Sequence, residues 1–257
     1  YLDVGQGDSS LIVTKNLKET ILIDTGGKVT YEKDSWQKQK KIYSIAENSL
    51  IPFFRSIGIN KIKYLILTHG DFDHMGEGVN LINNFKVENV ILNCGEFNTL
   101  EINLLKLLKE KNIKYYSCIN NIKTSDFTLN FLNTKKYNNE NDNSSVIYFD
   151  YNNYKFLFMA DASKKVEENI LNEYDLDKVD FLKVGHHGSN TSTSEKLVSK
   201  ISPKYSVISV GKNNRYGHPK IEVLNSLKSS NIYRTDIDGS IEIKLNKKAY
   251  NITTYSP

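Results

Sequence analysis

The sequence predicts a layered α/β protein in which two β-sheets pack face to face and helices cover their outer surfaces. Segments of strand character alternate with helical segments in two successive batches, an order that is typical of a layered structure. The chain has 257 residues, enough to bury a full core, and no Pro-, Gly- or Ser-rich linker interrupts it. We therefore expect a single domain over residues 1–257. A group of imidazoles and carboxylates directly follows one apolar strand, which is where sites form in such folds.

The first batch consists of short apolar strands and amphipathic helices. Runs rich in β-branched residues predict strands at 9–14, 20–23, 64–67 and 90–92. Apolar residues at helical spacing predict helices over 45–57, 78–85 and 100–111, with Pro52 as a possible kink in the first of them. The opening Asp-Val-Gly-Gln-Gly-Asp at 3–8 predicts a loop rich in turns, and the charged, aromatic stretch 29–41 predicts a surface loop.

The second batch begins after residue 113 and contains more strands than helices. Strands are predicted at 114–118, 127–133, 146–150, 154–159, 181–184 and 205–210, and near Ile232, Ile241 and Ile252. Helices are predicted at 164–172, 194–200 and 221–227. The Asn- and Asp-rich stretch 138–143 favours turns.

Composition is ordinary for a globular protein, with 39% hydrophobic and 25% charged residues. No apolar run has the length of a membrane span and no signal peptide opens the chain. The chain begins without Met, at Tyr1 and already in strand-like sequence, which suggests a piece of a longer protein. The net charge of +4 comes mainly from lysine; it weakly favours a polyanionic partner, and a solvated lysine surface explains it as well. Cys94 and Cys118 are too few for a disulfide framework, so we expect two buried small residues.

The densest group of chemically active residues lies at 68–76, Thr-His-Gly-Asp-Phe-Asp-His-Met-Gly, after the strand 64–67. Its two imidazoles and two carboxylates are His69, Asp71, Asp73 and His74. Imidazole nitrogen and carboxylate oxygen are the usual ligands of zinc and its first-row neighbours. Four such ligands this close together fit two ions better than one. A solvated polar loop that happens to contain two histidines is the alternative.

Further polar groups follow other predicted strands. Asp24 ends the strand 20–23, so it is expected either to hydrogen-bond the 68–76 loop or to cap the next turn. Asp161 follows the strand 154–159, where it suits a carboxylate that bridges two metals or one that caps a helix. His186 and His187 lie in a Gly-flanked loop after the strand 181–184, and His218 follows the strand 205–210. A packed, structural pair is the alternative for the two adjacent histidines.

These motifs occur in an order that resembles one known family. Asp-Val-Gly-Gln-Gly-Asp-Ser, Ile-Asp-Thr-Gly-Gly, Thr-His-x-Asp-x-Asp-His-x-Gly, Asn-Asp-Asn-Ser-Ser, Asp161, His-His-Gly-Ser and Tyr-Gly-His-Pro follow one another along the chain. Although the motifs themselves lie between residues 3 and 219, the resemblance spans residues 2 to about 243. Together the motifs are similar to the metallo-β-lactamase-type domain of the ComEC family, the DNA-uptake channel of natural competence. The resemblance implies a four-layer αββα sandwich with its site at the ends of the facing sheets. It also implies a parent protein with membrane-spanning and oligonucleotide-fold segments upstream.

The resemblance also implies a set of metal ligands. The first ion would take His69, Asp71 and Asp161, with Asn141 or Asn143 as a further ligand, and the second would take Asp73, His74, Asp161 and His218. Asp71 stands where the wider superfamily has a second histidine, and an Asn replaces a later one, so the first site is richer in oxygen. Two divalent ions are expected, with Mn²⁺ favoured and Zn²⁺ possible. Asp8 and Asp24 are expected to support the ligands from behind.

The expected activity is hydrolysis of DNA by a hydroxide activated between two ions, with Asp73 among the catalytic residues. His186 and His187 would contact phosphate and protonate the leaving oxygen. Residues expected to bind substrate are Ser144, Ser189, Thr191, Lys183, Lys212 and Arg215, and Tyr216 is a candidate for stacking a base. The resemblance implies degradation of the strand that is not imported, outside the cytoplasm and attached to a membrane channel. The alternatives are a DNA-guiding module that cuts nothing and a hydrolase of the same fold for a small phosphodiester, a lactone or a β-lactam.

Overall fold

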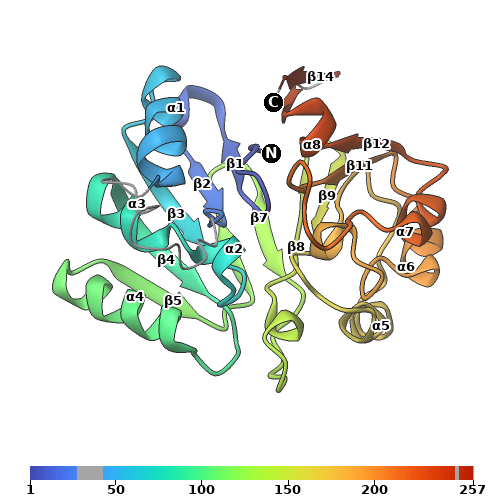
Figure 1. Ribbon diagram of the computed structural model, residues 1–257, viewed down its shortest axis with the longest axis horizontal. Helices are drawn as coiled ribbons and strands as arrows, with labels where there is room; N and C mark the ends of the chain where they lie inside the picture. The colour runs from blue at the N-terminus through green and yellow to red at the C-terminus, as the bar shows by residue number, and fades with distance from the viewer. Residues whose placement is uncertain (28–42, 247–248, 257) are drawn as a thin grey trace, which may run out of the picture.

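Two sheets form the centre of the molecule in the computed structural model, which describes residues 1–27, 43–246 and 249–256 (Figure 1). The first sheet has the strand order β1-β2-β3-β4-β5, and the second has the order β12-β11-β10-β9-β8-β7-β6. The strands of the first sheet are β1 Ser10–Val13, β2 Thr20–Ile23, β3 Lys61–Ile66, β4 Lys86–Leu92 and β5 Lys114–Ser117. Those of the second are β6 Asn121–Lys123, β7 Thr128–Phe131, β8 Ile147–Tyr151, β9 Tyr154–Phe158, β10 Phe181–Lys183, β11 Tyr205–Ile208 and β12 Asn231–Arg234. A separate antiparallel hairpin consists of β13 Ser240–Leu245 and β14 Tyr250–Tyr255.

Helices cover the outer face of each sheet (Figure 1). On the first sheet they are α1 Ile51–Ser56, α3 Gly78–Asn84 and α4 Thr99–Glu110. On the second they are α5 Lys164–Glu173, α6 Glu195–Ile201 and α7 Ile221–Ser226. The short helices α2 Phe72–Met75 and α8 Thr235–Asp238 lie in connections. The αββα sandwich expected from the sequence is therefore confirmed.

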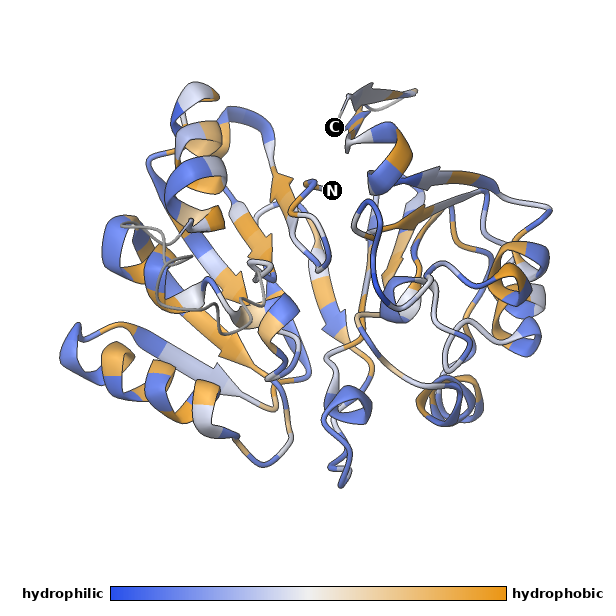
Figure 2. Cartoon of the chain, in the orientation of Figure 1, coloured by the Kyte–Doolittle hydropathy of each residue, from blue (hydrophilic) through white to orange (hydrophobic). Residues whose placement is uncertain are grey.

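Three apolar layers hold this sandwich together. One lies between the first sheet and its helices, one between the two sheets, and one between the second sheet and its helices. Strand β3 contributes to two of them, because Leu65 belongs to the outer layer and Ile66 to the layer between the sheets. Side chains alternate between the faces of a strand, so the end of β3, where both faces are buried, is apolar. Figure 2 shows this concentration of hydrophobic residues along the strands.

Parallel pairing at the centre of each sheet places several loops at the same edge. Strands β2 to β5 are parallel neighbours, as are β9 to β12 in their own sheet. The carboxyl ends of parallel strands meet at one edge, and this edge is where sites are built in open α/β sheets. The loops that follow β2, β3, β9, β10 and β11 carry the polar motifs of the sequence.

Most predicted elements are present, with differences at their ends. The helix expected over 45–57 begins as a π-helical segment, Ala46–Leu50, and continues as α1, where Pro52 occupies the first turn. Proline has no N–H to donate to the preceding turn, and Pro52 lies where the π-helical pattern changes to the α-helical one. Strand β6 and helix α8 were not expected, since neither has more than four residues. The surface loop predicted at 29–41 lies outside the described residues, and no described helix is long and apolar enough to span a membrane.

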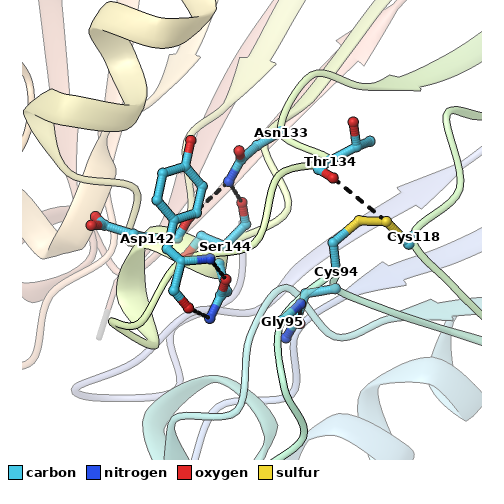
Figure 3. Close-up of a disulfide and its surroundings, with 10 residues drawn as sticks. Cys94, Gly95, Cys118, Asn133, Thr134, Asp142 and Ser144 are labelled. Carbon is cyan, nitrogen blue, oxygen red and sulfur yellow. Dashed lines mark hydrogen bonds between the residues drawn. A yellow bond between two sulfur atoms is a disulfide. The ribbon is translucent and has the colours of Figure 1, made fainter.

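The expectation that Cys94 and Cys118 are simply buried small residues is wrong. They form a disulfide that joins the end of β4 to the segment after β5, and Cys118 is exposed at the surface (Figure 3). Two cysteines 24 residues apart carry no pattern that identifies a pair, and only the parallel pairing of β4 with β5 brings them together. The disulfide lies beside Gly95, where an added Cβ would come within 2.6 Å of the Asn143 side chain. The disulfide therefore fixes the segments after β4 and β5 to each other at the place where the 137–144 loop packs against the first sheet.

Removal of this disulfide should destabilise the domain without changing its fold. Closing a loop of this length lowers the entropy of the unfolded chain, so the double variant Cys94→Ser, Cys118→Ser should lose about 3 kcal/mol of unfolding free energy. Urea unfolding followed by circular dichroism measures this loss. A reducing agent should lower the stability of the parent protein by a similar amount and leave the double variant unaffected. Equal stability of the two proteins in the absence of reductant would contradict this role.

Candidate metal centre

Five loops from the two sheets converge on one group of buried acids and imidazoles. Asp24 follows β2, the 67–76 segment follows β3, and Asp161 follows β9. The short 3₁₀ turn Gly185–Gly188 follows β10 and carries two histidines. The fifth loop follows β11 and runs through residues 211–219. Residues more than a hundred positions apart in the sequence thus become neighbours because the two sheets pack face to face.

The first cluster consists of His69, His74 and Asp161, whose ligand atoms all lie within 4.8 Å of one another. His74 Nε2 is 3.1 Å from Asp161 Oδ1, and His69 Nε2 is 4.0 Å from Asp161 Oδ2. Both histidines are completely buried, and Asp161 is 2% exposed. The atoms His69 Nε2, His74 Nε2 and Asp161 Oδ1 are buried and form no well-aligned hydrogen bond, although the last two lie 3.1 Å apart. Buried polar atoms rarely remain unpaired, so three that point at one place fit a bound cation.

A second cluster consists of Asp73, His74 and His187. His187 Nε2 is 3.1 Å from Asp73 Oδ2 and 3.7 Å from Asp161 Oδ2. Asp161 therefore lies between the two clusters, with one oxygen toward His74 and the other toward His187. Carboxylate and imidazole together suit a divalent first-row metal, and two adjacent clusters that share residues suit a pair of ions.

Asp24 holds the first cluster from behind. It accepts hydrogen bonds from the Thr68 N–H at 2.8 Å and the Thr68 hydroxyl at 2.7 Å. Its Oδ2 is also 2.8 Å from His74 Nδ1, so the carboxylate fixes the ring and leaves Nε2 for the cluster. A carboxylate behind a ligand histidine is a usual support in metal sites. The sequence-based expectation that Asp24 contacts the loop after β3 is confirmed by these contacts.

His187 is oriented in the same way by groups behind it. Its Nδ1 lies 2.9 Å from the Ser209 carbonyl oxygen, which accepts its proton, and 3.4 Å from Asp8 Oδ1. Asp8 in turn forms a buried ion pair with Lys183 at 2.7 Å. His187 therefore presents Nε2 to Asp73, as the second cluster requires.

The short distances between these acids and imidazoles shift their pKa values. Burial alone would lower the pKa of His187, but the carboxylates of Asp161, Asp73 and Asp8 raise it to about 10. Burial alone would raise the pKa of Asp161, but the imidazoles of His74, His187 and His69 hold it well below its usual value. Protons on the imidazoles thus balance the carboxylates when no cation does so. A cation that binds here must displace such protons.

The structure departs from the expected ligand set in two places. His218 belongs to neither cluster; its ring centroid lies 5.9 Å from that of His186, while His187 lies in the second cluster. Asp71 Oδ2 is 3.6 Å from His69 Nε2, but its side chain is 43% exposed and it also lies outside the clusters. The geometry therefore favours His187 over His218 as the last ligand.

The alternative amide ligand, Asn143, is occupied elsewhere. Its Oδ1 accepts the Tyr137 N–H at 2.8 Å and its Nδ2 donates to the Tyr137 carbonyl at 3.1 Å. An amide that uses both ends within its own loop has a structural role. The sequence could not show this, because the partner groups belong to the backbone.

Three residues expected to bind substrate are buried and bonded within the protein, which corrects the expectation. Lys183 is 1% exposed and is held by Asp8, because β10 points it into the interior rather than toward solvent. Ser144 is completely buried, and its hydroxyl accepts the Asp161 N–H at 3.1 Å, so it positions Asp161. Ser189 is 5% exposed and bonds Thr191 within its own loop. Lys212 and Arg215 are exposed, in keeping with their expected role.

His186 remains the accessible member of the histidine pair. Its side chain is 24% exposed, and its Nε2 lies 3.6 Å from Asp161 Oδ2. The Thr191 hydroxyl lies 3.0 Å from its Nδ1 and fixes the ring. Burial lowers the pKa of His186 below its ordinary value.

Two supporting residues were missed by the sequence analysis. Glu140 Oε1 accepts the Gly70 N–H at 2.6 Å, and Asn98 Nδ2 donates to the Gly70 carbonyl at 2.8 Å. Asn98 also caps α4, and this capping pattern with Glu101 is visible in the sequence. Its second role, holding the loop between His69 and Asp71, depends on packing of α4 against that loop and leaves no sequence signal.

Comparison with known proteins agrees with this fold. A family model described as the metallo-beta-lactamase superfamily matches residues 2–92. Among solved structures, a metallo-beta-lactamase fold protein, YhfI from Bacillus subtilis, superposes with a TM-score of 0.55 at 10% identity, covering 89% of each chain. CmlA, a diiron beta-hydroxylase from Streptomyces venezuelae, superposes with a TM-score of 0.52 at 11% identity over 90% of this chain and 53% of that one. The chain has the fold of the metallo-β-lactamase superfamily.

Curated relatives define the particular family. ComE operon protein 3 of Bacillus subtilis is 32% identical over all of this chain, and Recombination protein 2 of Haemophilus influenzae is 31% identical over all of it. Competence protein ComA of Neisseria gonorrhoeae is 27% identical over 98% of the chain. The chain is a metallo-β-lactamase-like domain of the ComEC family of competence proteins. It spans 34%, 30% and 33% of these three relatives, or about a third of their length.

Metal content should separate the two candidate ligands. His187→Ala removes an imidazole from the second cluster and should lower metal content by about one ion per chain, whereas His218→Ala should retain the parent content. Inductively coupled plasma mass spectrometry after dialysis against Mn²⁺ measures both. Full occupancy in His187→Ala together with loss in His218→Ala would restore His218 as the ligand.

Replacing Asp24 should weaken metal binding while the ligands remain in place. Asp24→Asn leaves an amide where a carboxylate orients His74, so Mn²⁺ affinity should fall by roughly 10- to 100-fold. Isothermal titration calorimetry measures the affinity. The matched control is Asp175→Asn, because that carboxylate is 95% exposed and pairs with Lys200 at the surface. Equal affinity in both variants would show that Asp24 does not support the site.

Proposed function

We propose that this domain hydrolyses phosphodiester bonds of DNA and that two divalent cations, Mn²⁺ in preference to Zn²⁺, occupy the two clusters. The observation that carries the proposal is the pair of adjacent acid and imidazole clusters that share His74 and flank Asp161. Such cations supply Lewis acidity toward a phosphodiester and make nearby water more acidic. His69, His74 and Asp161 would hold one ion, and Asp73, His187 and Asp161 would hold the other.

The side chains around the clusters have distinct tasks in this reaction. Asp161 faces both clusters and fixes their separation, while Asp73 lies at the edge of the second one and is partly exposed. Thr191 orients His186, so that Nε2 faces the site and can donate a proton toward the leaving oxygen. Burial of His69 and His74 excludes water from the rear of the clusters.

DNA as the substrate is supported by the family and by local charge. The three relatives are named a ComE operon protein, a recombination protein and a competence protein. Lys212 and Arg215 are exposed on the loop after β11, beside the site, where they can bind phosphates. We propose that the domain degrades the strand that is not imported and that it works attached to a membrane channel formed by the rest of its parent chain.

The disulfide supports a location outside the cytoplasm. Disulfides persist in oxidising compartments and are rare where glutathione keeps thiols reduced. Cys118 is exposed, so a reducing environment would have access to the Cys94–Cys118 bond. A domain that meets incoming DNA on the outer side of the membrane would keep this bond.

Cleavage of labelled DNA tests the proposal. With Mn²⁺ the purified domain should shorten 5′-labelled single-stranded DNA, and EDTA should abolish the reaction. Asp73→Ala and Asp161→Asn should each lower the rate on the order of a thousandfold, because removal of a ligand forfeits several kcal/mol of charge stabilisation in the transition state.

Asp175→Asn is again the matched control and should cleave like the parent. Cleavage by Asp73→Ala at the parent rate would assign the activity to a contaminant. If the domain binds DNA tightly and in a salt-dependent way but does not shorten it, the domain is a DNA-guiding module and not a hydrolase. Activity confined to a chromogenic lactone, β-lactam or small phosphodiester would show that the substrate is that small molecule and not DNA.

A further inference from the structure

A cavity of about 640 Å³ opens beside the metal centre and shares Asp73 with it. Its walls come from the opening loop of the chain, from the start of the helical segment before α1, and from the loop after β11. Among the described residues that line it are Gln6, Tyr43, Lys212, Arg215 and Tyr216. The volume lies within the range of pockets that enclose a small molecule. None of the proposed catalytic roles uses this space.

The glycine-rich opening of the chain builds the floor of the cavity. Gln6 Oε1 accepts the Gly211 N–H at 3.0 Å, and a Cβ at Gly211 would come within 2.6 Å of the Gln6 nitrogen. Gly7, at φ +140°, leaves no room for a side chain against the Asp73 carbonyl. The Asp8 N–H donates to that same carbonyl at 3.1 Å. Close backbone contacts thus fix both the loop after β11 and the Asp73 segment to the opening loop.

A row of aromatic rings leads from the cavity to the metal centre. Tyr216 stacks on His218, with ring centroids 5.6 Å apart and planes inclined by 24°. His218 lies 5.9 Å from His186, and His186 Nε2 lies 3.6 Å from Asp161. Tyr216 is nevertheless 58% exposed, so much of its ring remains accessible to solvent beside His218. A second flat ring can therefore extend the row on that accessible part.

The charges around the cavity suit a phosphate at its mouth. Lys212 is exposed and forms no ion pair with any residue that the structure describes. Arg215, three residues further on, is also exposed. Of the acids in the wall, Asp236 is already paired with Arg234 at 2.7 Å, and Asp3 accepts the Gly5 N–H at 3.0 Å. Two basic side chains of one loop thus line the cavity, while the carboxylates of Asp236 and Asp3 in its wall are already bonded to other groups.

We propose that this cavity receives one unpaired nucleotide of single-stranded DNA, next to the phosphodiester presented to the metal centre. The base stacks on Tyr216, and the flanking phosphate lies against Lys212 and Arg215. Stacking on one aromatic face requires a base that has left its duplex partner, and it is tolerant of base identity. This subsite rests on the proposed function, and it gives that function a preference for unpaired DNA.

Binding without hydrolysis tests the subsite separately from the activity. Fluorescence anisotropy of a dye-labelled oligodeoxythymidylate is measured in EDTA with the parent, Tyr216→Ala and Tyr216→Phe. Tyr216→Ala should raise Kd on the order of tenfold, while Tyr216→Phe, which keeps the ring, should match the parent. The control is Tyr116→Ala, since Tyr116 is a 45% exposed tyrosine on β5 and is not part of the cavity lining. It should bind like the parent, and a blunt duplex of equal length should compete poorly.

Several results would overturn the subsite. They are no binding by the parent, equal Kd values for Tyr216→Ala and the parent, an equal loss in Tyr116→Ala, or competition by the duplex as strong as by the single strand. If Tyr216→Ala weakens binding but the parent domain cleaves no DNA, the proposed subsite stands and the proposed hydrolase activity is refuted. The two proposals can therefore fail independently.

Discussion

The structure depends on keeping several buried charges balanced at one edge of two facing sheets. Asp8, Asp24, Asp161, Lys183 and the imidazoles of His69, His74 and His187 are all less than a tenth exposed. A charge removed from water costs several kcal/mol unless another charge or a set of hydrogen bonds compensates it. The loops after the strands supply that compensation, and the apolar layers supply the rigidity that holds it in place. Three ligand atoms of the cluster are nevertheless left without a well-aligned hydrogen bond, and a cation is the natural partner for them.

The fold was predictable from the sequence because its signal is local and repeated. Strands such as β3 are short apolar runs, and helices such as α4 show apolar residues at helical spacing, so the order of elements emerged without tertiary information. The elements that were missed, β6 and α8, are too short to show a period. The family motifs then fixed the arrangement of layers, which local patterns alone leave open.

The site was predictable in its residue types and less so in its assignments. Asp161 and the 68–76 loop meet as expected because each directly follows a strand of a parallel pair, and the ends of such strands lie at one edge. The choice between His187 and His218 depended on which loop reaches further into the interface. That is decided by packing of the Gly185–Gly188 turn, where both His186 and His187 adopt positive φ. The role of Lys183 was predicted wrongly for a related reason. Its burial depends on an ion pair with Asp8, which lies 175 residues earlier in the sequence, and the sequence around β10 carries no sign of that pairing.

The buried pair of Lys183 and Asp8 explains why the opening loop of the chain belongs to the site. Asp8 accepts from the Lys183 ammonium on β10, while its backbone N–H donates to the Asp73 carbonyl and its carbonyl accepts the Gly26 N–H at 2.8 Å. One residue thereby joins the second sheet to two loops of the first. Buried ion pairs add little net stability, yet loss of one partner leaves an uncompensated charge. Their value here is positional: the Lys183 ammonium holds the pKa of the Asp8 carboxyl well below its ordinary value against the opposing effect of burial, and this keeps a carboxylate beside His187. The same loop forms the floor of the neighbouring cavity, so a single set of contacts sets the position of the second cluster relative to the surface that a substrate would approach.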